Sequence, residues 1–265
     1  MKITILGCGP SVGIPTIGCK CDICKSALSD SKNKRTRTSA LIEHEGTTIL
    51  IDSSPDFKMQ AIANQIGSID AVIYTHPHAD HCAGITELSA IEPKGEQKTM
   101  PVYGSINTLT SVISSYPQLF IPNTPSNPWN KCHYLTINRI DYYKEWEIGS
   151  CKIVAFPQVH GNIISTGFIF NDLVAYCTDV KEFPQKSWEI LKSKKNLTLI
   201  LGCIGYQEAT AHAHLDLCLN WVEQLNTKQV ILTHMSHYID YYKINNELKT
   251  TPKIKAAYDG LVIEI

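Results

Sequence analysis

The chain has 265 residues, of which 43% are hydrophobic and 18% are charged. This length suffices for one mixed domain, or two small ones, with a large core. The formal net charge is −1, which disfavours a general nucleic-acid binder, because no basic excess is available to hold a phosphate backbone. No apolar run approaches the roughly 20 residues of a membrane span, and the first apolar stretch is too short for a signal peptide. We therefore expect a cytoplasmic protein without a membrane partner.

Short β-branched runs alternate with helical patterns along the chain. The expected elements are, in chain order, strand Lys2–Leu6, strand Thr47–Asp52, helix Asp56–Ile66, strand Ala71–Thr75, helix Ser105–Ser115, strand Lys152–Phe156, strand Val174–Thr178, helix Gln185–Ser193, strand Thr198–Leu201, helix Asp216–Leu225, strand Gln229–Thr233 and strand Leu261–Ile265. Asp216 is expected to cap its helix, and the proline-rich residues 117–132 are expected to form an irregular loop. This pattern predicts one α/β domain over residues 1–265.

The strongest chemical signal follows the expected strand Ala71–Thr75 directly. It reads HPHADH over residues 76–81. Three imidazoles and a carboxylate in one tight turn would repel or desolvate one another without a cation. His76 and His78 can face one point while Asp80 and His81 face a second, which suits two adjacent metals. Further ligands are expected from other strand ends, and the candidates there are His160, Asp179 and His234.

The order HPHADH, His160, Asp179, His234 resembles the metallo-β-lactamase superfamily, whose signature is HxHxDH followed by His, Asp and His. The match runs from the first expected strand to the last. It implies a four-layered αββα sandwich with a dinuclear site at the sheet edges. By position, one metal would be held by His76, His78 and His160, and the other by Asp80, His81 and His234. Asp179 would bridge the two, and Asp80 would also orient the attacking hydroxide as a catalytic residue.

The ten cysteines fall into two groups. Seven are scattered, several of them in apolar runs, and are expected to serve as small buried hydrophobic residues: Cys8, Cys82, Cys132, Cys151, Cys177, Cys203 and Cys218. The other three form a CxCxxC segment, Cys19, Cys21 and Cys24. Without a sign of secretion, a metal site is favoured over a disulfide framework.

Three thiolates need a fourth ligand for a tetrahedral zinc. His237 lies three residues after His234 and can turn away from the dinuclear site. The combination of an N-terminal GCG and CxCxxC with a C-terminal HxSH resembles one subgroup, the phosphodiesterases of the carbon–phosphorus lyase pathway, which open phosphoribosyl 1,2-cyclic phosphate. The resemblance implies a cysteine-rich zinc-binding loop near residues 18–25, with a structural zinc on Cys19, Cys21, Cys24 and His237.

The subgroup also carries a histidine before a leucine, some twenty residues ahead of the last metal histidine. By position this residue is His214, just ahead of a helix start whose dipole favours an anionic phosphate. The resemblance implies that His214 contacts the phosphate or protonates the leaving alkoxide. His212, two residues earlier, competes for that role.

The resulting hypothesis is a hydrolase with two active-site Zn²⁺ or Mn²⁺ ions, which cleaves a small, phosphoribosyl 1,2-cyclic phosphate-like phosphodiester by attack of a metal-bound hydroxide. Two alternatives stay open. A transfer-RNA 3′-processing nuclease is disfavoured by the neutral charge and by the lack of a long basic insertion. A coenzyme-biosynthesis relative with a non-phosphodiester role shares CxCxxC, but the complete ligand set favours catalysis. The sequence leaves open the physiological substrate, the catalytic metals and a homodimer.

Overall fold

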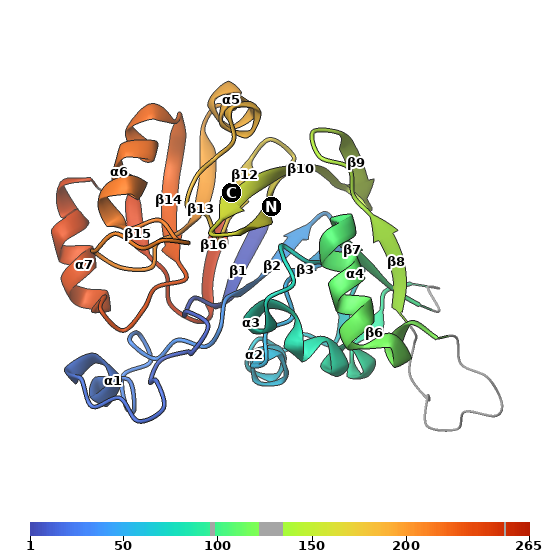
Figure 1. Ribbon diagram of the computed structural model, residues 1–265, viewed down its shortest axis with the longest axis horizontal. Coiled ribbons are helices and arrows are strands. Elements are labelled where there is room, and N and C mark those ends of the chain that lie inside the picture. Colours follow the sequence, from blue (N-terminus) through green and yellow to red (C-terminus); the bar gives the residue numbers. More distant parts are fainter. Residues whose placement is uncertain (96–98, 122–134, 252) are drawn as a thin grey trace.

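Two seven-stranded β-sheets stack face to face in the computed structural model, which describes residues 1–95, 99–121, 135–251 and 253–265 (Figure 1). The first sheet has the strand order β16-β1-β2-β3-β5-β7-β8. Its strands are β1 Lys2–Gly7, β2 Ser39–His44, β3 Thr47–Ile51, β5 Ala71–Ile73, β7 Met100–Gly104, β8 Leu135–Arg139 and β16 Leu261–Glu264. Strands β3, β5, β7 and β8 run parallel to one another, so their carboxyl ends lie at one edge.

The second sheet has the order β15-β14-β13-β12-β11-β10-β9. Its strands are β9 Glu145–Ile148, β10 Cys151–His160, β11 Ile163–Phe170, β12 Val174–Cys177, β13 Leu197–Gly202, β14 Thr227–Thr233 and β15 Ile254–Ala256. Strands β12 to β15 are parallel, whereas β9 to β12 form an antiparallel meander. A small pair, β4 Ser68–Ile69 with β6 Glu92–Pro93, lies apart from both sheets.

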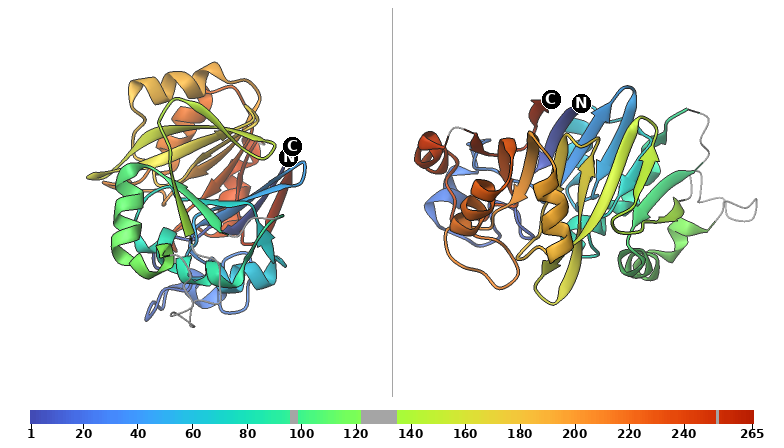
Figure 2. Two further views of the ribbon diagram at one scale, coloured as in Figure 1. Left: turned by 90° about the vertical axis from the view of Figure 1, so that its right-hand side faces the viewer. Right: turned by 90° about the horizontal axis from the view of Figure 1, so that it is seen from above.

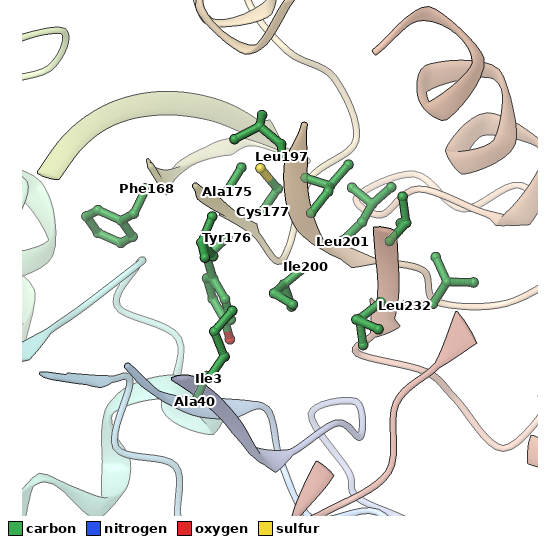
Figure 3. Packing of buried hydrophobic residues seen from close by; sticks show 14 of the residues in the cluster. Ile3, Ala40, Phe168, Ala175, Tyr176, Cys177, Leu197, Ile200, Leu201 and Leu232 are labelled. Atoms are coloured by element: carbon green, nitrogen blue, oxygen red, sulfur yellow. The ribbon is translucent and has the colours of Figure 1, made fainter. Parts of the chain in front are cut away.

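The main core lies between the two sheets. Ile3 and Ala40 of the first sheet point toward Tyr176, Ile200 and Leu232 of the second (Figure 3). All five side chains are 3% exposed or less, and burial of such apolar area is the main favourable term in folding. A second cluster, which includes Leu41 and Val72, packs the opposite face of the first sheet against helices.

Helices cover the outer faces of the stacked sheets (Figure 2). They are α1 Asp22–Ser26, α2 Phe57–Ala63, α3 Ala79–Cys82, α4 Ile106–Ser115, α5 Gln185–Ser193, α6 Leu215–Gln224 and α7 Tyr241–Glu247, with 3₁₀ helices η1 Ala83–Ala90, η2 Pro117–Phe120 and η3 Leu248–Thr250. The predicted αββα sandwich is therefore confirmed. None of the helices in the described ranges has the length and apolarity that a bilayer crossing requires.

Two local expectations are corrected. Helix α6 begins at Leu215 with His214 at its N-cap, so Asp216 lies inside the first turn instead of capping it. The reason is that Leu215 is buried, and its N–H bonds the carbonyl of Gly205, which fixes the helix start one residue earlier. The expected loop over 117–132 begins with η2, and its residues from 122 onward lie outside the described ranges.

Candidate metal centres

The predicted ligands lie at the carboxyl ends of strands from both sheets. Residues 76–81 follow β5, His160 ends β10, Asp179 follows β12 and His234 follows β14. Asp52, after β3, joins them. Asp52, Asp179 and His234 have φ of 60°, 51° and 56°, a left-handed conformation that non-glycine residues seldom adopt. This conformation reverses the chain directly after each strand, and such outliers are typical of functional sites.

The structure brings the first expected ligand group together. His78 Nδ1 lies 3.0 Å from His76 Nε2 and 3.3 Å from His160 Nε2. Three imidazole nitrogens that hold one tetrahedral ion at about 2.0–2.1 Å would lie roughly 3.4 Å apart. His76 and His160 are buried, whereas His78 is exposed. The group therefore matches a metal position that is open to solvent on the side of His78.

The second group lies across Asp179 from the first. His81 Nε2 is 3.3 Å from Asp80 Oδ2 and 3.2 Å from Asp179 Oδ2. The other carboxylate oxygen of Asp179, Oδ1, lies 3.3 Å from His234 Nε2 and 3.7 Å from His160 Nε2. The ligand atoms of Asp80, His81 and His234 lie within 4.8 Å of one another. Asp179 thus faces both groups, as a bridging ligand would.

The electrostatics of this cluster call for a cation. Burial alone would lower the pKa of His81, but Asp179 and Asp52 raise it well above its usual value. Burial would raise the pKa of Asp179, but His234 and His81 hold it well below its usual range. The Nε2 atom of His81 is buried without a hydrogen-bond partner among the described residues. A divalent metal at this nitrogen would satisfy it and would replace the positive charge that these carboxylates demand.

Hydrogen bonds behind the ligands set their orientation. Asp52 Oδ2 accepts from His81 Nδ1 at 2.7 Å and from Thr75 Oγ1 at 2.8 Å, and Thr75 Oγ1 in turn lies 2.9 Å from His76 Nδ1. Thr38 Oγ1 lies 3.0 Å from His234 Nδ1. Likewise, the Ala211 carbonyl accepts from His160 Nδ1 at 2.8 Å. With Nδ1 engaged, each of these four histidines presents Nε2 to the site, which is the arrangement that metal-binding histidines need.

Asp52 was not among the predicted site residues, although the sequence holds a signal for it. It is a carboxylate at the end of an expected buried strand, the same pattern that singled out Asp179. Its side chain is fully buried, and among the described residues it bonds to no lysine or arginine. A carboxylate in such a place requires a positively charged or strongly donating neighbour.

Asp52→Asn should weaken metal binding by about 10–100-fold, the usual cost of losing such an orienting partner. The amide would keep the left-handed backbone, which asparagine tolerates. In the wild-type protein, Asp52 Oδ2 accepts from both His81 and Thr75. In the variant this position would hold either an NH₂ group, which cannot accept a hydrogen bond, or an uncharged amide oxygen. Metal content after dialysis against a metal buffer measures the effect. The control is Asp70→Asn, because Asp70 accepts a hydrogen bond from the Thr48 N–H at 2.6 Å but contacts no candidate ligand. Equal metal affinity in the two variants would refute the orienting role of Asp52.

His212 and His214 lie in different surroundings. The His212 ring stacks on His234 at 4.9 Å between centroids and meets His160 edge-on at 4.6 Å, and its Nδ1 is 3.6 Å from Asp179 Oδ1. Burial, and then the charge of His234, lower the pKa of His212 to about 4. His214 joins none of the metal-ligating groups of the described chain, and its buried Nδ1 has no hydrogen-bond partner there. The structure thus places His212, and not His214, against the candidate ligands. The role of His214 as phosphate contact or proton donor stays a prediction.

The cysteine-rich segment meets His237 as the resemblance implies. His237 Nδ1 lies 3.4, 3.9 and 3.5 Å from the sulfurs of Cys19, Cys21 and Cys24. A tetrahedral zinc with Zn–S of about 2.3 Å and Zn–N of about 2.0 Å places sulfur and nitrogen about 3.6 Å apart. The N–H of Cys24 donates to Cys21 Sγ and lowers the pKa of Cys21. These four residues therefore fit a zinc ion. Helix α1, which contains Cys24 and has Cys21 at its N-cap, lies at the periphery of the molecule (Figure 1).

Cys21→Ser should release one zinc per chain and lower Tm by roughly 5–10 °C, which corresponds to about 2–3 kcal/mol in a chain of this size. Cys21 is exposed, so the substitution removes a ligand without removing core packing. Metal analysis and thermal unfolding test this expectation. Lys20→Ser, which alters the exposed neighbouring residue, should keep the zinc. A Cys21→Ser protein with unchanged zinc content and Tm would contradict the assignment.

The scattered cysteines behave as expected where the structure describes them. Six are buried and free: Cys8, Cys82, Cys151, Cys177, Cys203 and Cys218. Burial raises the pKa of Cys177 well above its usual value, as it does for a thiol that serves as a small apolar side chain. Cys132 lies outside the described residues.

Comparison with known proteins agrees with this geometry. Residues 47–235 match the family model of the β-lactamase superfamily domain. The crystal structure of a diphosphatase from the PhnP family superposes with a TM-score of 0.87 and 30% identity, over 100% of this chain and 97% of that one. The zinc-bound PqqB of Methylobacterium extorquens shares the fold, with a TM-score of 0.78 at 16% identity over the full length of both chains.

A curated relative is longer. The octanoyltransferase of Porphyromonas gingivalis is 31% identical over 262 residues, which are 98% of this chain and 51% of that protein. The chain therefore spans about half the length of this relative. Together, the sandwich, the two ligand groups at its strand ends and these matches show that the chain belongs to the metallo-β-lactamase superfamily and, within it, to the PhnP family.

Proposed function

We propose that this protein is a metal-dependent hydrolase of small phosphodiesters. The observation that carries the proposal is the pair of ligand groups that meet at Asp179, whose carboxylate lies 3.7 Å from His160 of one group and 3.2 and 3.3 Å from His81 and His234 of the other. Paired metal positions of this kind are typical of enzymes that cleave phosphate esters. The superfamily consists mostly of hydrolases, which agrees with this reaction class.

The residues present fit two divalent cations. His76, His78 and His160 would hold one, and Asp80, His81 and His234 would hold the other, with Asp179 shared. When bound, such a pair activates water near neutral pH and neutralises phosphate oxygens in an in-line displacement. Mixed imidazole and carboxylate ligands accept Zn²⁺ or Mn²⁺.

The remaining steps belong to the chain itself. Asp52, Thr75 and Thr38 hold the histidine rings in one tautomer, so the ligand set does not need to reorganise during the reaction. Asp80, part of whose surface is exposed, is placed to orient the attacking water as well as to ligate. His212 would contact the phosphate, because its ring lies against two ligands at the site, and it would protonate the leaving oxygen where the negative charge of the bound phosphate raises its lowered pKa.

The substrate class follows from the family and the charge. A phosphoribosyl 1,2-cyclic phosphate-like ester suits the subgroup with a CxCxxC zinc loop. A diphosphate ester is the second candidate, because a structure that matches over the full length at 30% identity is a diphosphatase. Both are small phosphate esters, and neither needs the basic surface that a nucleic acid requires. We propose a cytoplasmic enzyme that acts on such a molecule.

A metal-resolved activity screen tests the proposal. Metal-free protein is loaded with Zn²⁺ or Mn²⁺ and assayed against bis(p-nitrophenyl) phosphate, a cyclic nucleotide, a ribose cyclic phosphate, a diphosphate diester and a precursor transfer RNA. Hydrolysis of a small ester, abolished by chelation and restored by metal, supports the proposal. Selective cleavage of the transfer RNA would favour the nuclease, and a fully metallated protein that hydrolyses none of the five would overturn the assignment.

A further inference from the structure

The two candidate metal centres meet in one short turn of the chain. His234 belongs to the dinuclear cluster, and His237, three residues later, belongs to the cysteine cluster. The backbone between them is held on both sides, because Met235 N donates to the Cys8 carbonyl at 2.9 Å and Ser236 N donates to the Ile204 carbonyl at 3.0 Å. A change of position at one ligand would therefore be transmitted to the other through two residues that have little freedom.

A buried arginine spans this turn. The Arg35 side chain is 1% exposed. Its Nη1 donates to the Ser236 carbonyl at 3.1 Å and its Nη2 to the Ile239 carbonyl at 2.8 Å, so the guanidinium bonds the turn on both sides of His237. A planar group with several fixed donors can hold two carbonyls at once, which the single ammonium of lysine does less well.

The partners of Arg35 extend the support past the turn. Arg35 Nη2 also donates to Asn33 Oδ1 at 3.4 Å. Asn33 Oδ1 accepts from the Tyr241 N–H at 2.9 Å, and Asn33 Nδ2 donates to Asp240 Oδ2 at 2.7 Å. Asp240 is the N-cap of α7. The turn that carries His237 is thus fixed to the segment that begins at Asn33 and to the start of the next helix.

The segment of residues 33–38 also contacts the dinuclear cluster. Thr38, three residues after Arg35, lies at hydrogen-bond distance from His234 Nδ1. Arg35 pairs through its backbone with Ile14, at 2.8 and 3.0 Å, in the stretch that leads to the cysteine cluster. Residues 33–38 therefore contact both metal ligands, His234 through Thr38 and the turn of His237 through Arg35.

A purely structural role explains the arginine less well. Burial lowers the pKa of Arg35, which reflects the cost of keeping a guanidinium away from water. No carboxylate bonds to it directly in the described chain. Its described side-chain partners are two backbone carbonyls and one amide oxygen. Because this charge is costly to bury, we interpret its two carbonyl bonds as orienting the turn.

We propose that Arg35 is a positioning residue that couples the two metal centres: by holding the turn 236–239, it places His237 at the thiolates and keeps His234 aligned with the dinuclear cluster. Loss of the zinc would then weaken the dinuclear site, although the zinc contacts none of its ligands. This coupling depends on the metal assignments and not on the substrate, so a failure of the proposed phosphodiesterase activity leaves it testable.

The first test measures metal binding at each centre separately. Co²⁺ is titrated into metal-free protein, because thiolate-to-cobalt absorption reports the Cys₃His cluster and the weaker d–d bands report the imidazole and carboxylate cluster. Arg35→Met should weaken both centres by about 10–100-fold, and Arg35→Lys should recover part of the loss because it retains a donor. Arg37→Met is the matched control, since Arg37 pairs with Asp56 at 2.8 Å and bonds to neither ligand turn. Unchanged affinity at either centre in both Arg35 variants would overturn the proposal.

The second test is a double-mutant cycle with Cys21→Ser. Alone, this variant should weaken the dinuclear site several-fold through the loosened turn. Combined with Arg35→Met, or with Arg35→Lys should the methionine variant not fold, it should add little further loss, because the connection is already broken. Full dinuclear affinity in Cys21→Ser, or simple additivity of the two losses, would show that the centres are independent.

Discussion

Asp179→Ala is expected to lose both active-site metals and, with them, phosphodiester hydrolysis by at least about 10³-fold. The reason is geometric. Asp179 lies within 3.7 Å of a nitrogen from each ligand group, and its own side chain is 2% exposed, so no water can replace both carboxylate oxygens without rearrangement. Removal of the carboxylate also takes away the negative partner of His160 in one ligand group and of His234 in the other.

Metal analysis and activity should be measured on the same preparation of the Asp179→Ala protein. Asp172→Ala is a matched control, because Asp172 shares the left-handed backbone of Asp179 (φ of 57° and 51°) but lies in the turn between β11 and β12 and pairs on the surface with Lys194 at 2.6 Å. The control should keep its metals and its activity. If the Asp179 variant retained two metals per chain, the bridging assignment would be wrong, whatever its activity.

The second large effect concerns the leaving group. His212→Ala is expected to lower kcat by roughly 10²–10⁴-fold on an ester with an alkoxide leaving group. The loss should shrink on p-nitrophenyl esters, whose leaving group is stable without a proton. His212 is assigned to neither metal, so metal content should stay the same.

His214→Ala, measured beside it, separates the two histidines. The resemblance assigns the acid to His214, whereas the ring contacts favour His212. A selective loss confined to His214→Ala would restore the assignment that the sequence implied. Equal losses on both kinds of ester, together with lost metal, would make His212 a ligand. A small uniform loss in both variants would indicate a phosphate-binding pair.

The ligand groups could be predicted because their signal is local. HPHADH compresses four ligands into six residues, and His160, Asp179 and His234 each end a recognisable apolar strand. The structure places five of the seven at or just after a strand end, whereas Asp80 and His81 lie on the short helix α3 that follows β5. For the same reason, the CxCxxC segment by itself predicts a metal site, and the structure places His237 beside its three sulfurs.

Features that depend on long-range contacts could not be predicted in this way. Arg35 is a charged residue with nothing in its sequence neighbourhood that predicts burial, and its two carbonyl partners lie 201 and 204 residues away. The choice between His212 and His214 depends on a loop whose path is set by backbone bonds to Val180 and Gly205. Several strands, among them β2 and β11, were not predicted; β11 carries Ser165, Thr166 and Gly167 in its middle, which interrupts the apolar run that marks the other buried strands.

The ligands divide between the two sheets, and this division has a consequence for the interior. Residues 76–81 extend from the first sheet, whereas His160, Asp179 and His234 extend from the second. One residue along a strand advances the chain by about 3.3 Å, which equals the whole separation between His78 Nδ1 and His160 Nε2, 3.3 Å. A slide of one sheet over the other by a single residue would therefore dismantle both metal positions. Packing between the sheets in the core, such as that of Ile3 against Tyr176, therefore fixes the spacing of the ligands.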